Sequence, residues 1–280
     1  MIDRACSLAL VAVMLVVSAA YAGRVSRVGA ARQSRIDRAG GSPLLGKGPM
    51  QMGYWAMRPA ATACIAAGIG ANAVSWASLA LGAGAGAAFA LGHLGVGAAF
   101  GFVSSVCDAL DGMIARETGT ASDAGEVLDA AVDRYTELFF LGGLVFSARQ
   151  DALTVGLALA ATAGSMMVSY ATAKAEAFRV DVPRGAMRRQ ERAVYLVLGA
   201  ALTPLAAGAA ARWALPTWVG QLPLFLALAL VATVGNVSAV GRLYAVARAV
   251  RKPLRFPVRE ANKSKEIPRD AHAAAGDAIH

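Results

Sequence analysis

The chain has 280 residues, of which 57% are hydrophobic and only 16% are charged, and it carries a formal net charge of +9 at pH 7. A mean hydropathy of +0.52 and several apolar runs of about 20 residues exclude an ordinary soluble domain and indicate a helical integral membrane protein. We interpret the positive charge as membrane topology and contact with anionic membrane lipid, so no nucleic-acid partner is expected.

The first hydrophobic run covers residues 5–22. One basic residue precedes it, whereas six follow between Arg24 and Lys47, so the positive-inside rule places the following segment in the cytoplasm. Residues 1–23 are therefore predicted to form an uncleaved N-terminal transmembrane helix with its N-terminus outside. The run does end in Ala20-Tyr21-Ala22, which resembles a signal-peptide cleavage site.

Residues 24–70 are predicted to form a basic cytoplasmic linker followed by a short helix. The segment 50–68 mixes Met, Tyr and Trp with Arg58 and Pro59, which is typical of a helix that lies along the lipid headgroups. The bent start of a membrane-spanning helix is an equal alternative for the same residues.

A single helical domain is predicted over residues 71–245, followed by a basic, disordered cytoplasmic tail over 246–280. The glycine- and alanine-rich first span of the domain allows close helix packing, either within the bundle or across a dimer. Lys and Arg concentrate in the segments that this topology places in the cytoplasm, which supports it. The six predicted spans cover residues 72–91, 94–116, 125–148, 151–174, 191–211 and 218–241.

Four aspartates, one pair on each helix, lie near the point where the second and third of these spans meet. Asp108 and Asp111 are three residues apart and Asp129 and Asp133 are four apart, so each pair shares one face of a helix. Four like charges at one level near a membrane surface repel one another and need cations. Oxygen ligands suit Mg²⁺ or Mn²⁺, and four carboxylates are enough for two ions.

Two glycines and an arginine accompany the acids. Gly112 and Gly125 lie one helical turn or less from Asp111 and Asp129, and a bare backbone there admits close approach of a ligand. Arg116 adds a fixed cation suited to phosphate. Metal ligands, bare backbone and an arginine together indicate a site for a diphosphate-containing substrate.

This stretch resembles the CDP-alcohol phosphotransferase (CDP-alcohol phosphatidyltransferase) family, whose signature it matches at every fixed position. The resemblance implies an all-α integral membrane bundle of six transmembrane helices that forms a homodimer and requires Mg²⁺ or Mn²⁺. It also implies transfer of a phosphatidyl group from CDP-diacylglycerol to a polar alcohol acceptor, with release of CMP. The matching run is Asp108-x2-Asp111-Gly112-x2-Ala115-Arg116-x8-Gly125-x3-Asp129-x3-Asp133.

The resemblance also implies roles for individual residues. Asp108, Asp111 and Asp129 are expected as metal ligands, and Asp133 is expected as both a ligand and the general base. The CDP group is expected to contact the small residues and the arginine of the signature, together with Ser75 of an Asn72-Ala-Val-Ser75 run that loosely matches a second family motif. The expected CDP-binding residues are Gly112, Ala115, Arg116, Gly125 and Ser75.

Basic residues gather around the cytoplasmic loop near 174–192, and this pattern resembles the branch of the family that makes phosphatidylinositol phosphate or its archaeal counterpart. Lys174, Arg189 and Arg192 are therefore expected to bind an anionic acceptor, inositol 1-phosphate ahead of glycerol 3-phosphate. Thr172 stands where that branch has a basic residue. Positive-inside topology alone is the alternative explanation for these charges.

The predicted protein is therefore a multi-pass phospholipid-synthesis enzyme of a bacterial or archaeal cytoplasmic membrane. Its active site faces the cytoplasm, because the second span of the domain runs towards that side and the third leaves it. Two alternatives of other classes are an ion or proton transporter with intramembrane carboxylates and a non-catalytic scaffold of the same fold. A transporter would spread its acids through several helices at mid-membrane.

Overall fold

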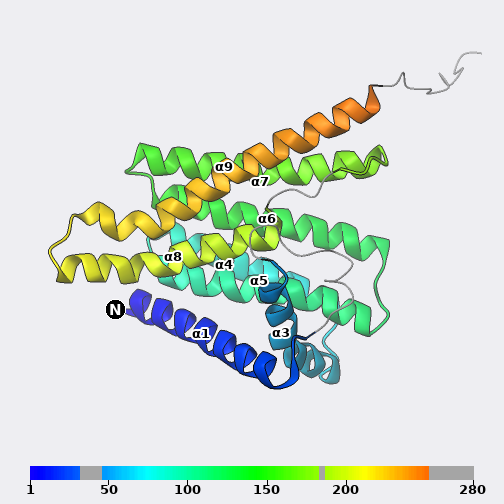
Figure 1. Ribbon diagram of the computed structural model, residues 1–280, viewed down its shortest axis with the longest axis horizontal. Coiled ribbons are helices and arrows are strands. Elements are labelled where there is room, and N and C mark those ends of the chain that lie inside the picture. The colour runs from blue at the N-terminus through cyan, green and yellow to red at the C-terminus, as the bar shows by residue number, and fades with distance from the viewer. Residues whose placement is uncertain (32–45, 183–186, 252–280) are drawn as a thin grey trace, which may run out of the picture.

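The structure, a computed structural model, describes residues 1–31, 46–182 and 187–251 and forms eight helices within these ranges (Figure 1). Most of the predicted linker and of the predicted tail lie outside the described residues. The helices are α1 (Ile2–Val28), α3 (Gly48–Ala66), α4 (Ala71–Ala90), α5 (Leu94–Glu117), α6 (Asp123–Ser147), α7 (Ala152–Ala177), α8 (Arg189–Arg212) and α9 (Thr217–Val250).

Six of the described helices, α1, α4, α5, α7, α8 and α9, are long and apolar enough to cross a membrane. Helix α6 is 25 residues long, which corresponds to roughly 37 Å at 1.5 Å per residue, and it lies within the bundle (Figure 1). Asp133, Arg134 and Glu137 reduce its apolar character. The chain is therefore a membrane bundle of six helices with an additional N-terminal helix, as predicted, and the charges of α6 mark its inner face as functional.

Two helices extend beyond their predicted boundaries, and the position of α3 favours one of its two predicted forms. Helix α1 continues to Val28, so the first residues of the predicted linker are helical. Helix α3 ends before a separate α4 begins and is steeply inclined to the other helices (Figure 1), which favours an interfacial helix over a bent transmembrane one. Helix α9 continues to Val250, well beyond the predicted end at 241.

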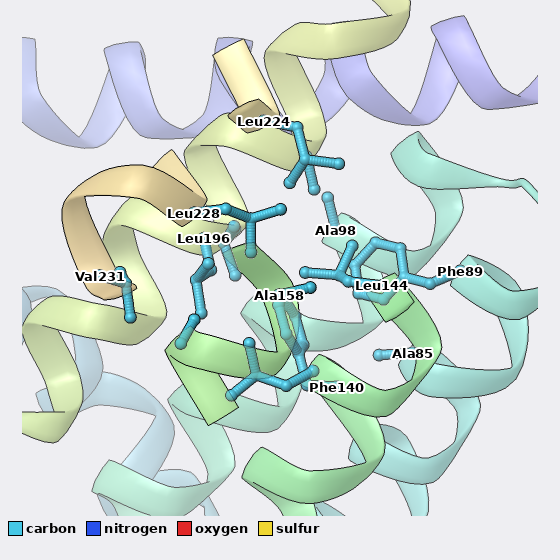
Figure 2. Close-up of a cluster of buried hydrophobic side chains, with 14 of the residues drawn as sticks. Ala85, Phe89, Ala98, Phe140, Leu144, Ala158, Leu196, Leu224, Leu228 and Val231 are labelled. Atoms are coloured by element: carbon cyan, nitrogen blue, oxygen red, sulfur yellow. The ribbon is translucent and has the colours of Figure 1, made fainter. Parts of the chain in front are cut away.

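A large hydrophobic cluster joins the helices of the bundle (Figure 2). Its centre contains an edge-to-face pair of Phe89 and Phe140, whose ring centroids are 4.7 Å apart. Alanines fill the narrow places between the larger side chains, which lets the helices approach closely. Labelled members are Ala85, Phe89, Ala98, Phe140, Leu144, Ala158, Leu196, Leu224, Leu228 and Val231.

Helices α4 and α6 cross at two glycines, one on each helix. A β-carbon placed on Gly86 would overlap the carbonyl of Phe139, and one placed on Gly143 would overlap the carbonyl of Gly86. This contact brings α6 against α4 at backbone distance. The small residues of α4 therefore pack within the bundle, which was one of the two predicted alternatives; the other was packing across a dimer.

Helix α1 packs on α5 and α8. Asp3 Oδ1 accepts hydrogen bonds from the backbone N–H groups of Gly95 (2.7 Å) and Val96 (3.0 Å), so the first turn of α1 caps the N-terminus of α5. The two helices therefore run in the same direction, and the C-terminal end of α1 lies at the same end of the bundle as the acids of α5.

The α4–α6 crossing predicts a sharp difference between adjacent glycines. Gly143→Ala should destabilise the protein by about 1–3 kcal/mol, because the added methyl group overlaps backbone. Gly142→Ala is the matched control, since nothing lies within 4 Å of its β-carbon position, and it should leave stability unchanged or slightly higher. Thermal unfolding of detergent-purified protein measures both. Equal effects of the two substitutions would contradict this packing.

Candidate metal and anion site

A tight turn between α5 and α6 places the acids opposite one another. Gly119 adopts φ +68° just after α5, a backbone conformation that strains other residues. Ser122 then caps α6, because its hydroxyl oxygen accepts a hydrogen bond of 3.2 Å from the backbone N–H of Gly125. The chain reverses within a few residues, so the last turns of α5 face the first turns of α6.

Three acids meet at this end of the bundle. Carboxylate oxygens of Asp108, Asp129 and Asp133 all lie within 4.8 Å of one another. Asp133 is buried, and the other two are half-buried. Three negative charges so close together repel strongly at low solvent exposure, and a cation between them removes that cost. We call Asp108, Asp129 and Asp133 the acid triad.

The guanidinium of Arg189, the first residue of α8, lies in the acid triad. Its Nη2 and Nη1 donate hydrogen bonds to the two carboxylate oxygens of Asp108 at 2.8 and 3.0 Å, and Nη1 also forms an ion pair with Asp133 Oδ1. A side-chain cation thus already occupies the place where a metal ion is expected. The hard oxygen donors of the triad also fit a divalent ion, so the residues present suit a metal site.

Asp111 is not a member of the acid triad, although it was predicted as a fourth ligand of the metals. It is buried, and its Oδ2 accepts a short hydrogen bond of 2.6 Å from the hydroxyl of Ser75 on α4. Its Oδ1 accepts from the backbone N–H of Gly112 at 2.6 Å. Ser75, predicted to contact CDP, therefore holds an acid of the signature, and its contact with CDP stays a prediction.

The remaining signature residues surround the acids. A β-carbon on Gly112 would lie 2.9 Å from Nη1 of Arg116, so the arginine covers the bare backbone of α5. Gly125 provides the N–H that Ser122 caps, and Ala115 is half-buried one turn beyond Asp111. The roles of these residues in binding CDP stay predictions.

A cavity of about 260 Å³ adjoins the acid triad. Asp133 belongs to both, because it is a member of the triad and also lines the cavity. Arginines dominate the rest of the wall, so the cavity suits an anion placed beside a metal site. The charged lining residues are Asp133, Arg134, Arg188, Arg189, Arg192 and Arg242.

The three predicted acceptor-binding residues differ in their surroundings. Arg189 and Arg192 line the cavity, but Arg189 is bound to the acid triad. Arg192 is fully buried, and its Nε and Nη2 donate to the two carboxylate oxygens of Glu137 at 2.8 and 3.1 Å. The Nζ of Lys174 lies 5.5 Å from the ring centroid of Tyr170, and Lys174 is not among the residues that line this cavity.

Arg134 does not pair with Glu137, although the spacing of the two residues along α6 favours such a pair. Glu137, one turn further along α6, binds Arg192 of α8, and this bidentate pair joins the two helices. Arg134 instead donates to the carbonyl of Ala130 at 3.1 Å and lies 3.7 Å from the carboxylate of Asp133. A bidentate pair across helices satisfies both buried groups better than a neighbouring residue on the same helix can.

Arg242 is the residue that sequence reasoning missed. It lies on α9 beyond the predicted end of the last span, and its Nη1 donates a hydrogen bond of 2.7 Å to the hydroxyl of Thr172. The signal was present in the sequence, since an arginine directly after a predicted transmembrane run can continue the helix. Ending the last span at residue 241 hid the position of Arg242 in the cavity.

A model of the family described as CDP-alcohol phosphatidyltransferase matches residues 68–234 of this chain. The phosphatidylinositol phosphate synthase of Mycobacterium marinum is 32% identical over 167 residues, which cover 59% of this chain and 67% of that protein.

Two solved structures of the Mycobacterium tuberculosis phosphatidylinositol phosphate synthase share the fold. The one with CDP-DAG bound has a TM-score of 0.58 and 26% sequence identity, and the match covers 68% of this chain and 92% of that one. The one in complex with manganese and citrate has a TM-score of 0.59 and 25% identity, over 68% and 88% of the respective chains. The core helices of the bundle therefore have the same arrangement as those of a known membrane enzyme.

The acid triad predicts a specific loss of metal binding. Asp129→Asn removes one carboxylate oxygen and the negative charge, so Mn²⁺ affinity should fall by more than about a hundredfold, beyond the 10–100-fold typical of outer-shell changes. Asp123→Asn is the matched control, because Asp123 is an exposed acid of the same helix outside the triad. Electron paramagnetic resonance of free Mn²⁺ measures both. An unchanged affinity in Asp129→Asn would show that the triad does not hold the metal.

Proposed function

Because this chain belongs to the CDP-alcohol phosphatidyltransferase family, we propose that it transfers the phosphatidyl group of CDP-diacylglycerol to inositol 1-phosphate and releases CMP. One observation carries the proposal: Asp133 lies at the junction of the acid triad and an arginine-lined cavity. A diphosphate held at the triad and an anionic alcohol held in the cavity would meet at this side chain.

The triad is the proposed binding site for Mg²⁺ or Mn²⁺, with two ions expected and Asp111 as the further ligand. A divalent cation bound there would neutralise the diphosphate and stabilise charge on the departing CMP. Arg116, above the bare backbone at Gly112, would bind a phosphate of the donor. The manganese bound in one relative and the CDP-DAG bound in another structure of that relative support these assignments.

Asp133 is the proposed general base. In the transfer step the acceptor hydroxyl oxygen bonds to the phosphorus that carries diacylglycerol, and the bond from that phosphorus to the CMP oxygen breaks. The hydroxyl proton passes to the carboxylate of Asp133, which is the acid of the triad that reaches the cavity. Arg189, bound to Asp108 and Asp133, keeps that carboxylate facing α8.

The arginine-lined cavity is the proposed site for the phosphate of the acceptor. Three of its guanidinium groups are paired with acids: Arg189 with Asp108, Arg192 with Glu137, and Arg134 with Asp133 at 3.7 Å. Arg242 reaches the cavity from α9 and donates to Thr172, at the position where the resemblance to the phosphatidylinositol phosphate branch leads us to expect a basic residue. The missing charge is therefore supplied from another helix, which favours a phosphorylated acceptor over a neutral one.

The remaining proposals concern the organisation of the whole protein. We propose an N-terminal helix, a linker with an interfacial helix up to residue 70, a catalytic domain from residue 71, and a C-terminal tail. The predicted boundaries at 23 and 245 are moved to the observed helix ends at Val28 and Val250. We also propose a homodimer in a bacterial or archaeal cytoplasmic membrane. The transporter alternative loses support, because the acid triad is confined to the two neighbouring helices α5 and α6.

An acceptor panel tests the proposed reaction. Purified protein with CDP-diacylglycerol and Mg²⁺ should release CMP with inositol 1-phosphate, and only weakly with serine or free inositol, because these lack the phosphate that the arginines bind. Lipid products are identified by mass spectrometry. Preference for glycerol 3-phosphate would keep the anionic cavity and replace the acceptor. Preference for serine or free inositol would overturn the role of the cavity.

Arg242 should act on the acceptor alone. Arg242→Gln removes a cation from the cavity, so the KM for inositol 1-phosphate should rise by about tenfold or more while the KM for CDP-diacylglycerol stays unchanged. Arg248→Gln, an exposed arginine of the same helix, is the charge-matched control. Equal effects of the two substitutions on the acceptor KM would remove Arg242 from the site.

The cytoplasmic orientation of the site predicts the labelling of position 30. On a background without other cysteines, Ala30→Cys should react with a membrane-impermeant maleimide only after cells are permeabilised, because basic flanking residues hold this segment inside. Labelling in intact cells would place the acid triad on the outer side.

A further inference from the structure

A second cavity, of about 710 Å³, lies between the C-terminal end of α1 and helix α3. It is larger than the cavity at the acid triad and is separate from it. Its wall lies outside residues 68–234, the part that matches the family model, so the catalytic bundle does not account for it. The lining residues are Arg24, Trp55, Arg58, Pro59, Thr62, Ala63 and Ala66.

The wall combines two cations with an aromatic ring and an apolar strip. Arg24 comes from α1 and Arg58 from α3, so the two guanidinium groups approach the cavity from different helices. Arg24 Nη1 donates to the carbonyl of Gly29 at 2.8 Å, and a guanidinium has further N–H donors for a phosphate. Trp55 is packed against Tyr21 with ring centroids 5.5 Å apart, and alanines of α3 continue the wall.

The cavity lies at the headgroup level of the membrane. Helix α1 is long and apolar enough to span, and Arg24 and Arg27 lie in its last turns. The cap that Asp3 forms on α5 makes α1 and α5 parallel, so Arg24 lies at the same end of the bundle as Asp108. Tryptophan, arginine and the end of a spanning helix are together typical of the boundary between lipid headgroups and acyl chains.

We propose that this cavity binds one anionic phospholipid of the surrounding leaflet. Arg24 and Arg58 bind its phosphate, Trp55 lies beside the glycerol region, and the alanine strip of α3 contacts an acyl chain. Charge complementarity selects this occupant, because two arginines over an apolar strip favour an anionic amphiphile over a zwitterionic one. A soluble anion lacks the acyl chain that the strip would contact.

A bound lipid would also hold α3 in place. Helix α3 packs on α5 through a hydrophobic cluster that includes Ala61 of α3 and Leu110, Met113 and Ile114 of α5. These α5 residues alternate with Asp108 and Asp111 along the same turns. A lipid that contacts both α1 and α3 would therefore stabilise the position of α3, which packs against the acid-bearing helix α5. This inference does not depend on the proposed acceptor or on the reaction.

Quenching of Trp55 tests the site in the full-length protein. Trp76, Trp213 and Trp218 are replaced by Phe, and emission is measured in nanodiscs that contain brominated phosphatidylglycerol or brominated phosphatidylcholine. We expect selective quenching by phosphatidylglycerol, and Arg24→Gln with Arg58→Gln should weaken its apparent affinity by about tenfold or more. The charge-matched pair Arg27→Gln with Arg248→Gln, both exposed and outside the cavity, should retain the selectivity.

Equal quenching by the two lipids, or equal losses in the two double variants, would overturn the proposal. Native mass spectrometry of the protein with all four tryptophans is the second measurement, in case the single-tryptophan protein does not fold. The parent should retain phosphatidylglycerol more tightly than Arg24→Gln with Arg58→Gln does, and identical retention would also overturn it. Displacement of the lipid by inorganic phosphate alone would show a soluble-anion site and contradict the proposed occupant.

Discussion

Repulsion among the three carboxylates of the acid triad is the constraint on which this structure depends. Asp108, Asp129 and Asp133 lie on two helices that a short turn brings together, and their oxygens are within 4.8 Å of one another. Such a cluster is stable beside a membrane only with a cation in it. Arg189 supplies that cation here, and the same demand is the physical basis of the divalent metal site that we propose at the triad.

The rest of the bundle holds this unfavourable arrangement in place. Glycine contacts set α6 directly against α4, and the buried pair of Arg192 and Glu137 ties α8 to α6 one turn from Asp133. Ser75 fixes Asp111 from a third helix. Removing one member of a buried pair leaves the other charge buried without a partner. These polar contacts therefore contribute more to selecting one arrangement of the helices than to the stability of the protein.

Local spacing predicted most of the fold and the centre of the site. The intervals between the acids, read on helices, were enough to place Asp108 opposite Asp129 and Asp133. Contacts between distant segments were not accessible in this way. Spacing along α6 favours a pair of Glu137 with nearby Arg134, whereas the partner of Glu137 is Arg192, which is 55 residues away. The position of Arg242 on α9 was missed because the last span was predicted to end at residue 241. Nothing in the spacing indicated that Asp111 turns towards Ser75.

Anomalous scattering from a crystal grown with Mn²⁺ tests the central claim most directly, because it locates the cation and the arginine in one map. The account predicts a manganese peak coordinated by oxygens of Asp108, Asp129 and Asp133, with the guanidinium of Arg189 withdrawn from the space it now shares with them. A manganese peak elsewhere, or an acid triad that keeps Arg189 in place and binds no manganese, would contradict it.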